Sequence, residues 1–132
     1  MPVVDASVLV DYLAGGQHSE ESRARLLAGD EGLWAPHLVD AEVGHVLRRA
    51  VLKGELRPAV GRAALEDLAD LPVRRAGHRG LLERAWSLRS NVGFYDALYV
   101  ALAELLDMPL ITLDGRLAGA TGVRARVEVL SS

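Results

Sequence analysis

Cysteine is absent from this chain of 132 residues. Its absence excludes disulfide bonds and thiolate metal sites, and it agrees with a reducing compartment. No apolar run approaches the roughly 20 residues that a membrane-spanning helix needs. The first residues, MPVVDASVLVDYLAGG, lack the basic leader of a signal peptide. These absences predict a cytoplasmic protein that does not enter a membrane.

Glycine-rich phosphate loops are missing too, because neither G-x-x-x-x-G-K-S/T nor G-x-G-x-x-G occurs. Folds that bind nucleotide cofactors are therefore disfavoured. The four histidines show no paired spacing typical of metal ligands. His45 lies one turn beyond Glu42 and could touch a site there.

Lysine is scarce, since Lys53 is the only lysine among 15 basic residues. Arginine, which supplies the rest, binds phosphate in a bidentate manner better than lysine does. A codon bias in the genome would give the same composition. The 18 acidic residues bring the net charge to −3, so the basic balance typical of a nucleic-acid-binding domain is lacking.

The length predicts one domain over residues 1–132, and the apolar half of the chain is sufficient for a sizeable core. Strands are expected at 2–5, 32–36, 72–75, 108–113 and 126–130. Helices are expected at 7–15, 18–28 with Ser19 as N-cap, 37–53, 58–70, 80–90 and 96–106. This alternation predicts an α/β fold with a mostly parallel sheet and helices on both faces.

Four acidic residues lie inside or beside apolar runs: Asp5, Glu42, Asp96 and Asp114. A carboxylate next to a core needs a partner, because its ionised form is otherwise disfavoured. Asp5 and Asp114 end predicted strands, and Asp96 opens the helix that leads into the 108–113 strand. Sites in open α/β sheets form outside the carboxyl ends of strands, where the strand order reverses. Because Glu42 lies on the apolar stripe of its helix, we expect all four side chains to converge.

Each acid also has an ordinary structural alternative. Asp5 and Asp114 could simply cap the helices that follow them, and Asp96 could be favoured by the helix dipole. Glu42 could pair with an arginine of its own helix. The remaining acids on polar helical faces or near helix ends are predicted to be solvated: Asp11, Glu66, Asp67, Asp70, Glu83 and Glu104.

Two hydroxyl residues accompany these acids. Ser7, two residues after Asp5, could donate to that carboxylate or to a metal-bound water, or could only cap a helix. Thr112 alternates with Asp114 on the predicted strand and could donate a hydrogen bond that supports the site indirectly.

A carboxylate cluster without histidine or cysteine suits Mg²⁺ or Mn²⁺. Such ions neutralise phosphate charge and activate water as a nucleophile, and the residues leave open whether one or two ions bind. A competing hypothesis is a phosphatase of the haloacid-dehalogenase type, in which Asp5 would be the nucleophile. That mechanism requires a second aspartate two residues later, where Ser7 stands.

Three blocks from Val3 to Ala118 resemble the PIN-domain nucleases, and most closely the VapC-type toxins of bacterial toxin–antitoxin pairs. The blocks are VVDASVLV, HLVDAEVGHVLRRA and FYDALYVALAELLDMPLITLDGRLA. The resemblance implies a three-layer fold with a five-stranded parallel sheet and a Mg²⁺-dependent endoribonuclease. It also implies that Asp5, Glu42, Asp96 and Asp114 are the catalytic, metal-binding acids and that Ser7 is the supporting hydroxyl.

The same resemblance implies a homodimer and a cognate VapB-like antitoxin whose tail occupies the active-site groove, often with an arginine facing the carboxylates. The apolar residues expected at a partner surface, unless they are ordinary core, are Leu9, Tyr12, Leu13 and Leu38. The arginines expected to approach RNA are Arg48, Arg49, Arg89 and Arg116. A catalytically silent PIN-fold module that binds RNA or a partner is the alternative function.

Overall fold

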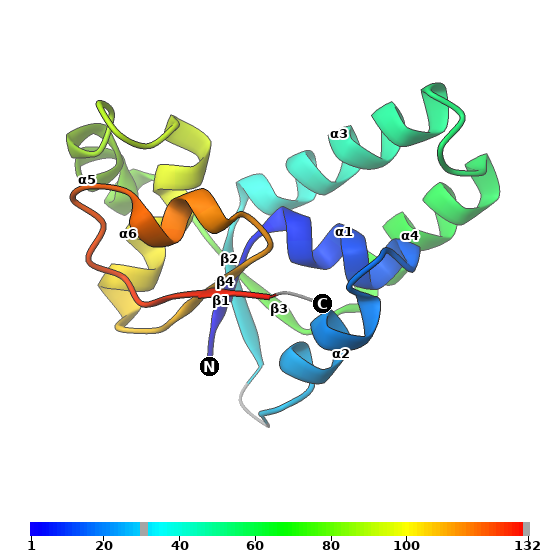
Figure 1. Ribbon diagram of the computed structural model, residues 1–132, viewed down its shortest axis with the longest axis horizontal. Coiled ribbons are helices and arrows are strands. Elements are labelled where there is room, and N and C mark those ends of the chain that lie inside the picture. The colour runs from blue at the N-terminus through cyan, green and yellow to red at the C-terminus, as the bar shows by residue number, and fades with distance from the viewer. Residues whose placement is uncertain (30–31, 131–132) are drawn as a thin grey trace.

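Five short strands form one parallel sheet at the centre of the structure, a computed structural model that describes residues 1–29 and 32–130 (Figure 1). The strands are β1 (Val3–Val4), β2 (Leu33–Pro36), β3 (Val73–Ala76), β4 (Leu110–Thr112) and β5 (Val127–Val129). Their order across the sheet is β3-β2-β1-β4-β5, and every neighbouring pair is parallel. The predicted five-stranded parallel sheet is confirmed.

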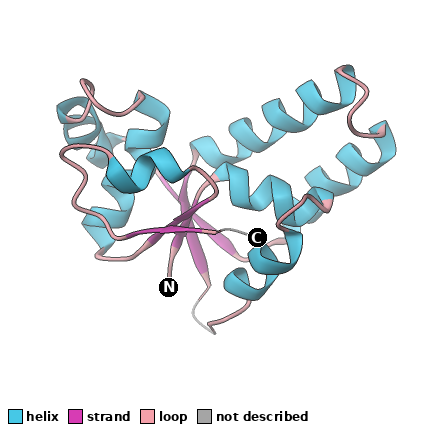
Figure 2. Ribbon diagram, in the orientation of Figure 1, coloured by secondary structure: helices cyan, strands magenta, loops and turns pink. Residues whose placement is uncertain are grey.

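Helices cover both faces of this sheet, as Figure 2 shows by secondary structure. The helices are α1 (Ala6–Ala14), α2 (Ser19–Leu26), α3 (Leu38–Leu52), α4 (Pro58–Asp70), α5 (Leu82–Ser87) and α6 (Phe94–Leu106). The first four lie on one side of the sheet, and α5 and α6 lie on the other (Figure 1). This arrangement confirms the predicted three-layer α/β fold. Within the described residues, no helix is both long and apolar enough to cross a membrane.

The strand order reverses between β1 and β4, which are direct neighbours. Val3 pairs with Leu110 and Val4 with Ile111, and the Asp5 amide donates to the Ile111 carbonyl at 3.2 Å. Because both strands run in the same direction, the residues that follow them emerge at the same edge of the sheet. This edge is the crevice in which ligands of open α/β sheets bind.

Helix α6 packs against the centre of the sheet and is buried almost all round. Its seven consecutive residues from Ala97 to Ala103 are buried, as the apolar sequence predicted. The helix begins at Phe94, two residues before the predicted start, because Gly93 has an extended conformation and serves as its N-cap. Asp96 therefore lies in the first turn of α6, where the helix dipole favours an acidic side chain.

The starts of α2 and α5 also differ from their predictions, and those of α1 and α3 are each shifted by one residue. Ser19 is the first residue of α2 rather than its N-cap; His18 occupies that position and makes no side-chain capping bond. The predicted helix at 80–90 is a 3₁₀ turn, η1 (Arg79–Leu81), followed by the six-residue α5. The 3₁₀ turn gives the chain a tighter path from β3 into α5.

Asp11 was predicted to be solvated, and this prediction was wrong. Its carboxylate is buried and accepts hydrogen bonds from the His18 amide at 3.0 Å and the Ser22 hydroxyl at 2.8 Å. These bonds join α1 to α2 across a tight turn. Glycine suits position 16, because a Cβ atom there would clash with Asp11 Oδ1 and displace the carboxylate from its hydrogen bonds.

Glu104 is also not a freely solvated acid. Its carboxylate is half-buried and pairs with Arg84 at 2.7 Å, which joins α6 to α5, and it accepts from the Arg124 amide at 2.8 Å. The other four acids that were predicted to be solvated are exposed, as expected: Glu66, Asp67, Asp70 and Glu83.

Candidate active site

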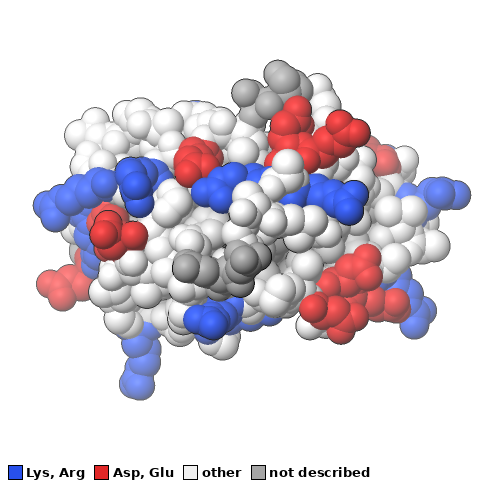
Figure 3. All heavy atoms as spheres, turned by 90° about the horizontal axis from the view of Figure 1, so that it is seen from below, with Lys and Arg blue, Asp and Glu red and all other residues white. Residues whose placement is uncertain are grey.

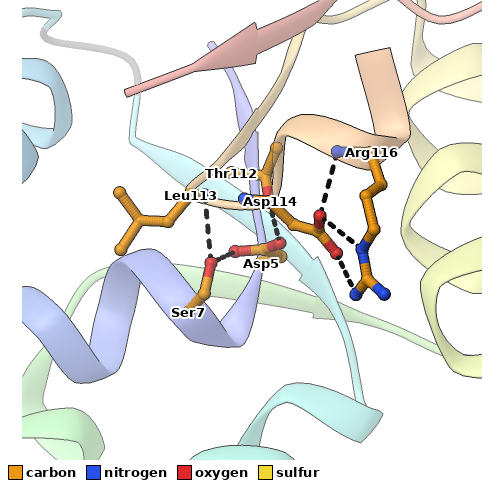
Figure 4. Close-up of polar contacts among 6 residues, drawn as sticks. All are labelled: Asp5, Ser7, Thr112, Leu113, Asp114 and Arg116. Atoms are coloured by element: carbon orange, nitrogen blue, oxygen red, sulfur yellow. Dashed lines mark hydrogen bonds and ion pairs between the residues drawn. The ribbon is translucent and has the colours of Figure 1, made fainter. Parts of the chain in front are cut away.

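Asp5 lies at the carboxyl end of β1 with its side chain buried and both oxygens hydrogen-bonded (Figure 4). Oδ1 accepts from the Ser7 hydroxyl at 2.5 Å and from the Val8 amide at 3.3 Å, so Asp5 is also the N-cap of α1. Oδ2 accepts from the Thr112 hydroxyl of β4. The sequence analysis treated helix capping and a position in the site as alternatives for Asp5. The structure shows both, because Asp5 caps α1 and also lies at the sheet edge beside β4.

The two hydroxyls that bind Asp5 are oriented by the backbone after β4. The Leu113 amide donates to Ser7 Oγ at 3.1 Å, and the Asp114 amide donates to Thr112 Oγ1 at 3.0 Å. Each hydroxyl oxygen is thus an acceptor of a backbone proton, and its own proton points to Asp5. Burial raises the pKa of Asp5 above its usual value, although these hydrogen bonds oppose the increase.

Asp114 follows β4 and is bound by Arg116. The guanidinium donates from Nε to Oδ1 at 3.0 Å and from Nη2 to Oδ2 at 2.8 Å, and the Arg116 amide donates to Oδ1 at 3.0 Å (Figure 4). Asp114 is therefore also the N-cap of the 3₁₀ helix η2 (Gly115–Gly119). The hydrogen bond from Arg116 lowers the pKa of Asp114.

Asp96 and Glu42 are half-buried, and in the described part of the chain neither carboxylate takes part in a hydrogen bond of standard geometry or an ion pair. Burial raises the pKa of Asp96, the charge of Asp114 adds to the increase, and Arg116 opposes it. Burial likewise raises the pKa of Glu42; the Tyr99 hydroxyl opposes this, and the charges of Asp96 and Asp5 add to it.

One pocket of about 460 Å³ receives all four acidic side chains. They come from the end of β1, the second turn of α3, the first turn of α6 and the end of β4. The pocket is lined by Asp5, Ala6, Ser7, Val10, Asp11, Ala14, Gly16, Glu42, Val46, Asp96, Tyr99 and Asp114. The expected convergence of the four acids is therefore observed. Glu42 does not pair with an arginine of its helix.

The donor set of this pocket fits a hard divalent cation. Its charged ligands are carboxylates, and three of them have raised pKa values because burial and mutual repulsion leave their charges uncompensated. No three acidic or histidine side chains of residues 1–29 and 32–130 are close enough together to hold an ion between them. Mg²⁺ matches such a site, because it typically takes one or two carboxylates and keeps several water ligands.

Of the arginines expected near RNA, Arg116 alone contacts a pocket acid in the described structure. Arg89 stacks on Trp86, with its guanidinium carbon 4.9 Å from the ring centroid. Arg48 and Arg49 are exposed on α3 and do not line the pocket, nor does the exposed His45. The face seen in Figure 3 carries both basic and acidic side chains, so it is not a uniformly basic surface.

Two pocket residues with polar side chains were missed from the sequence, Asp11 and Tyr99. Asp11 was placed on a polar helical face, and Tyr99 was read as part of an apolar buried helix. The available signal was spacing: Tyr99 lies three residues after Asp96, and residues at this spacing share a helix face.

The expected partner surface is only partly available. Leu9 is fully buried, so for this residue the alternative of ordinary core packing holds. Tyr12, Leu13 and Leu38 are partly buried and pack against the core. Tyr12 also lines a separate pocket of about 360 Å³ beside α2 and β2.

Comparisons with known proteins agree with this geometry. Residues 3–122 match the family model described as PIN domain. The chain is 50% identical over 129 residues to "Ribonuclease VapC1" of Mycobacterium tuberculosis, covering 97% of this chain and 96% of that protein. It is also similar to the solved structure of VapBC-5 from the same organism, a member of the VapBC family of toxin-antitoxin systems (26% identity, TM-score 0.62, covering 99% and 98% of the two chains).

A further solved structure, VapBC2 from Rickettsia felis bound to a DNA fragment from its promoter, shares the fold with 13% identity. Its TM-score is 0.70, and the match covers 98% of each chain. The sequence match and the shared three-layer architecture lead to the same assignment: the chain belongs to the PIN-domain family and, within it, to the VapC ribonucleases.

Proposed function

We propose that this protein is a Mg²⁺-dependent endoribonuclease and the toxin of a VapBC-type toxin–antitoxin pair. The observation that carries the proposal is the convergence of Asp5, Glu42, Asp96 and Asp114 on one pocket at the reversal of strand order. The similarity to a ribonuclease along almost the whole chain supports RNA as the substrate.

One or two of the four carboxylates would bind the ion directly and the others would bind it through its water ligands, with Mn²⁺ as a substitute for Mg²⁺. When bound, the ion offsets phosphate charge and lowers the pKa of water. Asp5 supplies a fixed acceptor because Ser7 and Thr112 orient it. Asp96 and Glu42 keep their oxygens free of strong partners and therefore face the pocket as available ligands.

Arg116 supplies the positive charge nearest to the four acids. Its guanidinium is exposed, and among residues 1–29 and 32–130 its ion-pair partner is Asp114. Arginine is well suited to phosphate because its planar donors bind two oxygens at once. In the proposed function, Arg116 exchanges Asp114 for a phosphate of the RNA backbone, and this offsets the net negative charge of the chain.

The proposed partner is a VapB-like antitoxin, since the chain is similar to a solved member of the VapBC family of toxin-antitoxin systems. A homodimer and a larger toxin–antitoxin assembly in the cytoplasm belong to the same proposal. The partly buried Tyr12, Leu13 and Leu38 remain the apolar residues proposed for contact with a partner.

Mapping RNA ends in bacteria that express the chain tests this function. The wild-type protein is expected to create new RNA ends at defined positions, and co-expression of the antitoxin is expected to suppress them. Asp96→Asn is the control, because it removes one pocket charge while keeping a side chain of the same size. Identical RNA ends from the wild type and the variant would mean that the chain is not the nuclease.

A further inference from the structure

The pocket contains an uneven distribution of hydrogen-bond donors. Both oxygens of Asp5 accept from oriented hydroxyls, and both oxygens of Asp114 accept from Arg116. Asp11, at the pocket wall, accepts from His18 and Ser22. Glu42 and Asp96 are therefore the pocket carboxylates without a hydrogen bond of standard geometry in the described structure, although the Tyr99 hydroxyl lies close enough to Glu42 to oppose the increase in its pKa.

One hydrogen-bond donor in the same pocket, the Tyr99 hydroxyl, makes no hydrogen bond of standard geometry within the described structure. Tyr99 is only 1% exposed and lines the pocket. Burial raises its pKa, and the adjacent Glu42 carboxylate raises it further. The phenol thus stays protonated at every physiological pH and can act only as a neutral donor.

Core packing alone does not account for this hydroxyl. A phenylalanine would fill the same volume within α6, and a buried hydroxyl without an acceptor destabilises the fold. Asp5 already has a donor at each oxygen, so Glu42 and Asp96 remain as acceptors. Of these two, only Glu42 is near enough to the Tyr99 hydroxyl for hydrogen bonding to affect the pKa values of both groups, whereas Asp96 acts on Tyr99 through its charge alone. The Glu42 side chain also depends most on an orienting partner. It is longer than an aspartate side chain, and it extends from a helix rather than from the end of a strand.

We propose that Tyr99 is a positioning residue whose hydroxyl donates to the Glu42 carboxylate and holds it towards the pocket as a divalent ion binds. This role rests on the proposed function, in which Glu42 is one of the metal-binding acids. Tyr99 itself touches neither the ion nor the RNA. The hydroxyl leaves one oxygen of Glu42 free, so the carboxylate can take part in both interactions.

The test compares Tyr99→Phe with the wild-type protein by calorimetric titration with Mn²⁺ alone, without RNA. Removing a residue that orients a metal ligand typically lowers metal affinity by roughly 10–100-fold, and an effect in this range is expected here. The melting temperature of the metal-free variant should stay the same or rise, because an unpaired buried hydroxyl has been removed. A hydroxyl that only stabilises the fold predicts a lower melting temperature for Tyr99→Phe and no change in Mn²⁺ affinity.

Tyr95→Phe is the matched control, since Tyr95 lies on the same helix but is 61% exposed and does not line the pocket. It should bind Mn²⁺ as the wild type does. A Glu42→Gln background should remove most of the effect of Tyr99→Phe if Tyr99 acts through Glu42. The inference is overturned if Tyr99→Phe binds Mn²⁺ within about twofold of the wild type, or if the wild type binds none.

RNA cleavage, measured separately on the same proteins, distinguishes this inference from the proposed function. Wild-type protein that binds Mn²⁺ but cuts no RNA would refute the nuclease function and leave the role of Tyr99 intact. Wild-type protein that cuts RNA, with a Tyr99→Phe variant that binds Mn²⁺ normally, would refute only the role of Tyr99.

Discussion

Asp5→Asn is expected to lower the rate of RNA cleavage by at least about a hundredfold, the usual cost of losing a major electrostatic group in an active site. The charge of Asp5 is lost, and so is the hydrogen-bond pattern around it. Ser7 and Thr112 both donate to Asp5, and backbone amides fix the direction of both hydroxyls. An asparagine must place its NH₂ group against one of these donors.

The same substitution should also destabilise the fold, because a buried donor then lacks an acceptor. The expected cost is about 1–3 kcal/mol. Cleavage assays and urea unfolding of purified Asp5→Asn, carried out where the variant is still folded, measure both effects. Ser7→Ala is the control: it removes one donor but keeps the carboxylate, so it should retain more activity. Cleavage by folded Asp5→Asn within tenfold of the wild type would contradict this account of Asp5.

Asp96→Asn is expected to raise the melting temperature of the metal-free protein at neutral pH. The pKa values of Asp5, Glu42 and Asp96 are raised by burial and by repulsion among the acids. The folded protein therefore binds protons more readily than the unfolded chain, and these groups favour the fold at low pH. Their contribution is lost as the pH rises from the ordinary carboxyl pKa through the raised values.

The expected increase at pH 7.5 is limited to about 2–5 °C, or roughly 1 kcal/mol for a domain of this size, because solvent screens the half-buried Asp96 charge. It should shrink as the pH is lowered, because the wild-type Asp96 then becomes neutral. Mg²⁺ should stabilise the wild type more than the variant. Asp114→Asn is the matched control, and it should lower the melting temperature instead. The hydrogen bond from Arg116 lowers the pKa of Asp114, so the charged form of this acid favours the fold at neutral pH. A lower melting temperature for metal-free Asp96→Asn at pH 7.5 would contradict the claim that the charge of Asp96 destabilises the metal-free fold.

The sequence predicts the architecture well because each layer has its own periodicity. Alternating apolar strands and amphipathic helices define a parallel α/β sheet, and Pro58 marks the start of α4 at the predicted residue. Boundaries are weaker where backbone geometry decides them. The extended Gly93 moves the start of α6, and a 3₁₀ turn shortens the helix before it.

The four acids could be found from the sequence because acidic residues stand out in apolar runs. Ser7 and Thr112 could be predicted as donors, but the acid that Thr112 binds could not, since hydrogen bonds across the sheet edge depend on side-chain direction. Thr112 reaches Asp5 from another strand, and Arg116 folds back onto Asp114 within η2. Tyr99 was not predicted as a site residue, because an aromatic residue in an apolar helix is typical of the core. Only the structure shows that Tyr99 lines the acidic pocket.

The central claim is that the acidic pocket cuts RNA by means of a divalent ion. The most direct test is the cleavage rate of a single-stranded RNA by purified protein as the Mg²⁺ concentration is varied, for the wild type and Asp96→Asn. We predict cleavage that rises with Mg²⁺ and stops with a chelator, and at least about a hundredfold slower cleavage by the variant. Cleavage that persists in excess chelator, or an Asp96→Asn variant that cuts as fast as the wild type, would contradict the claim.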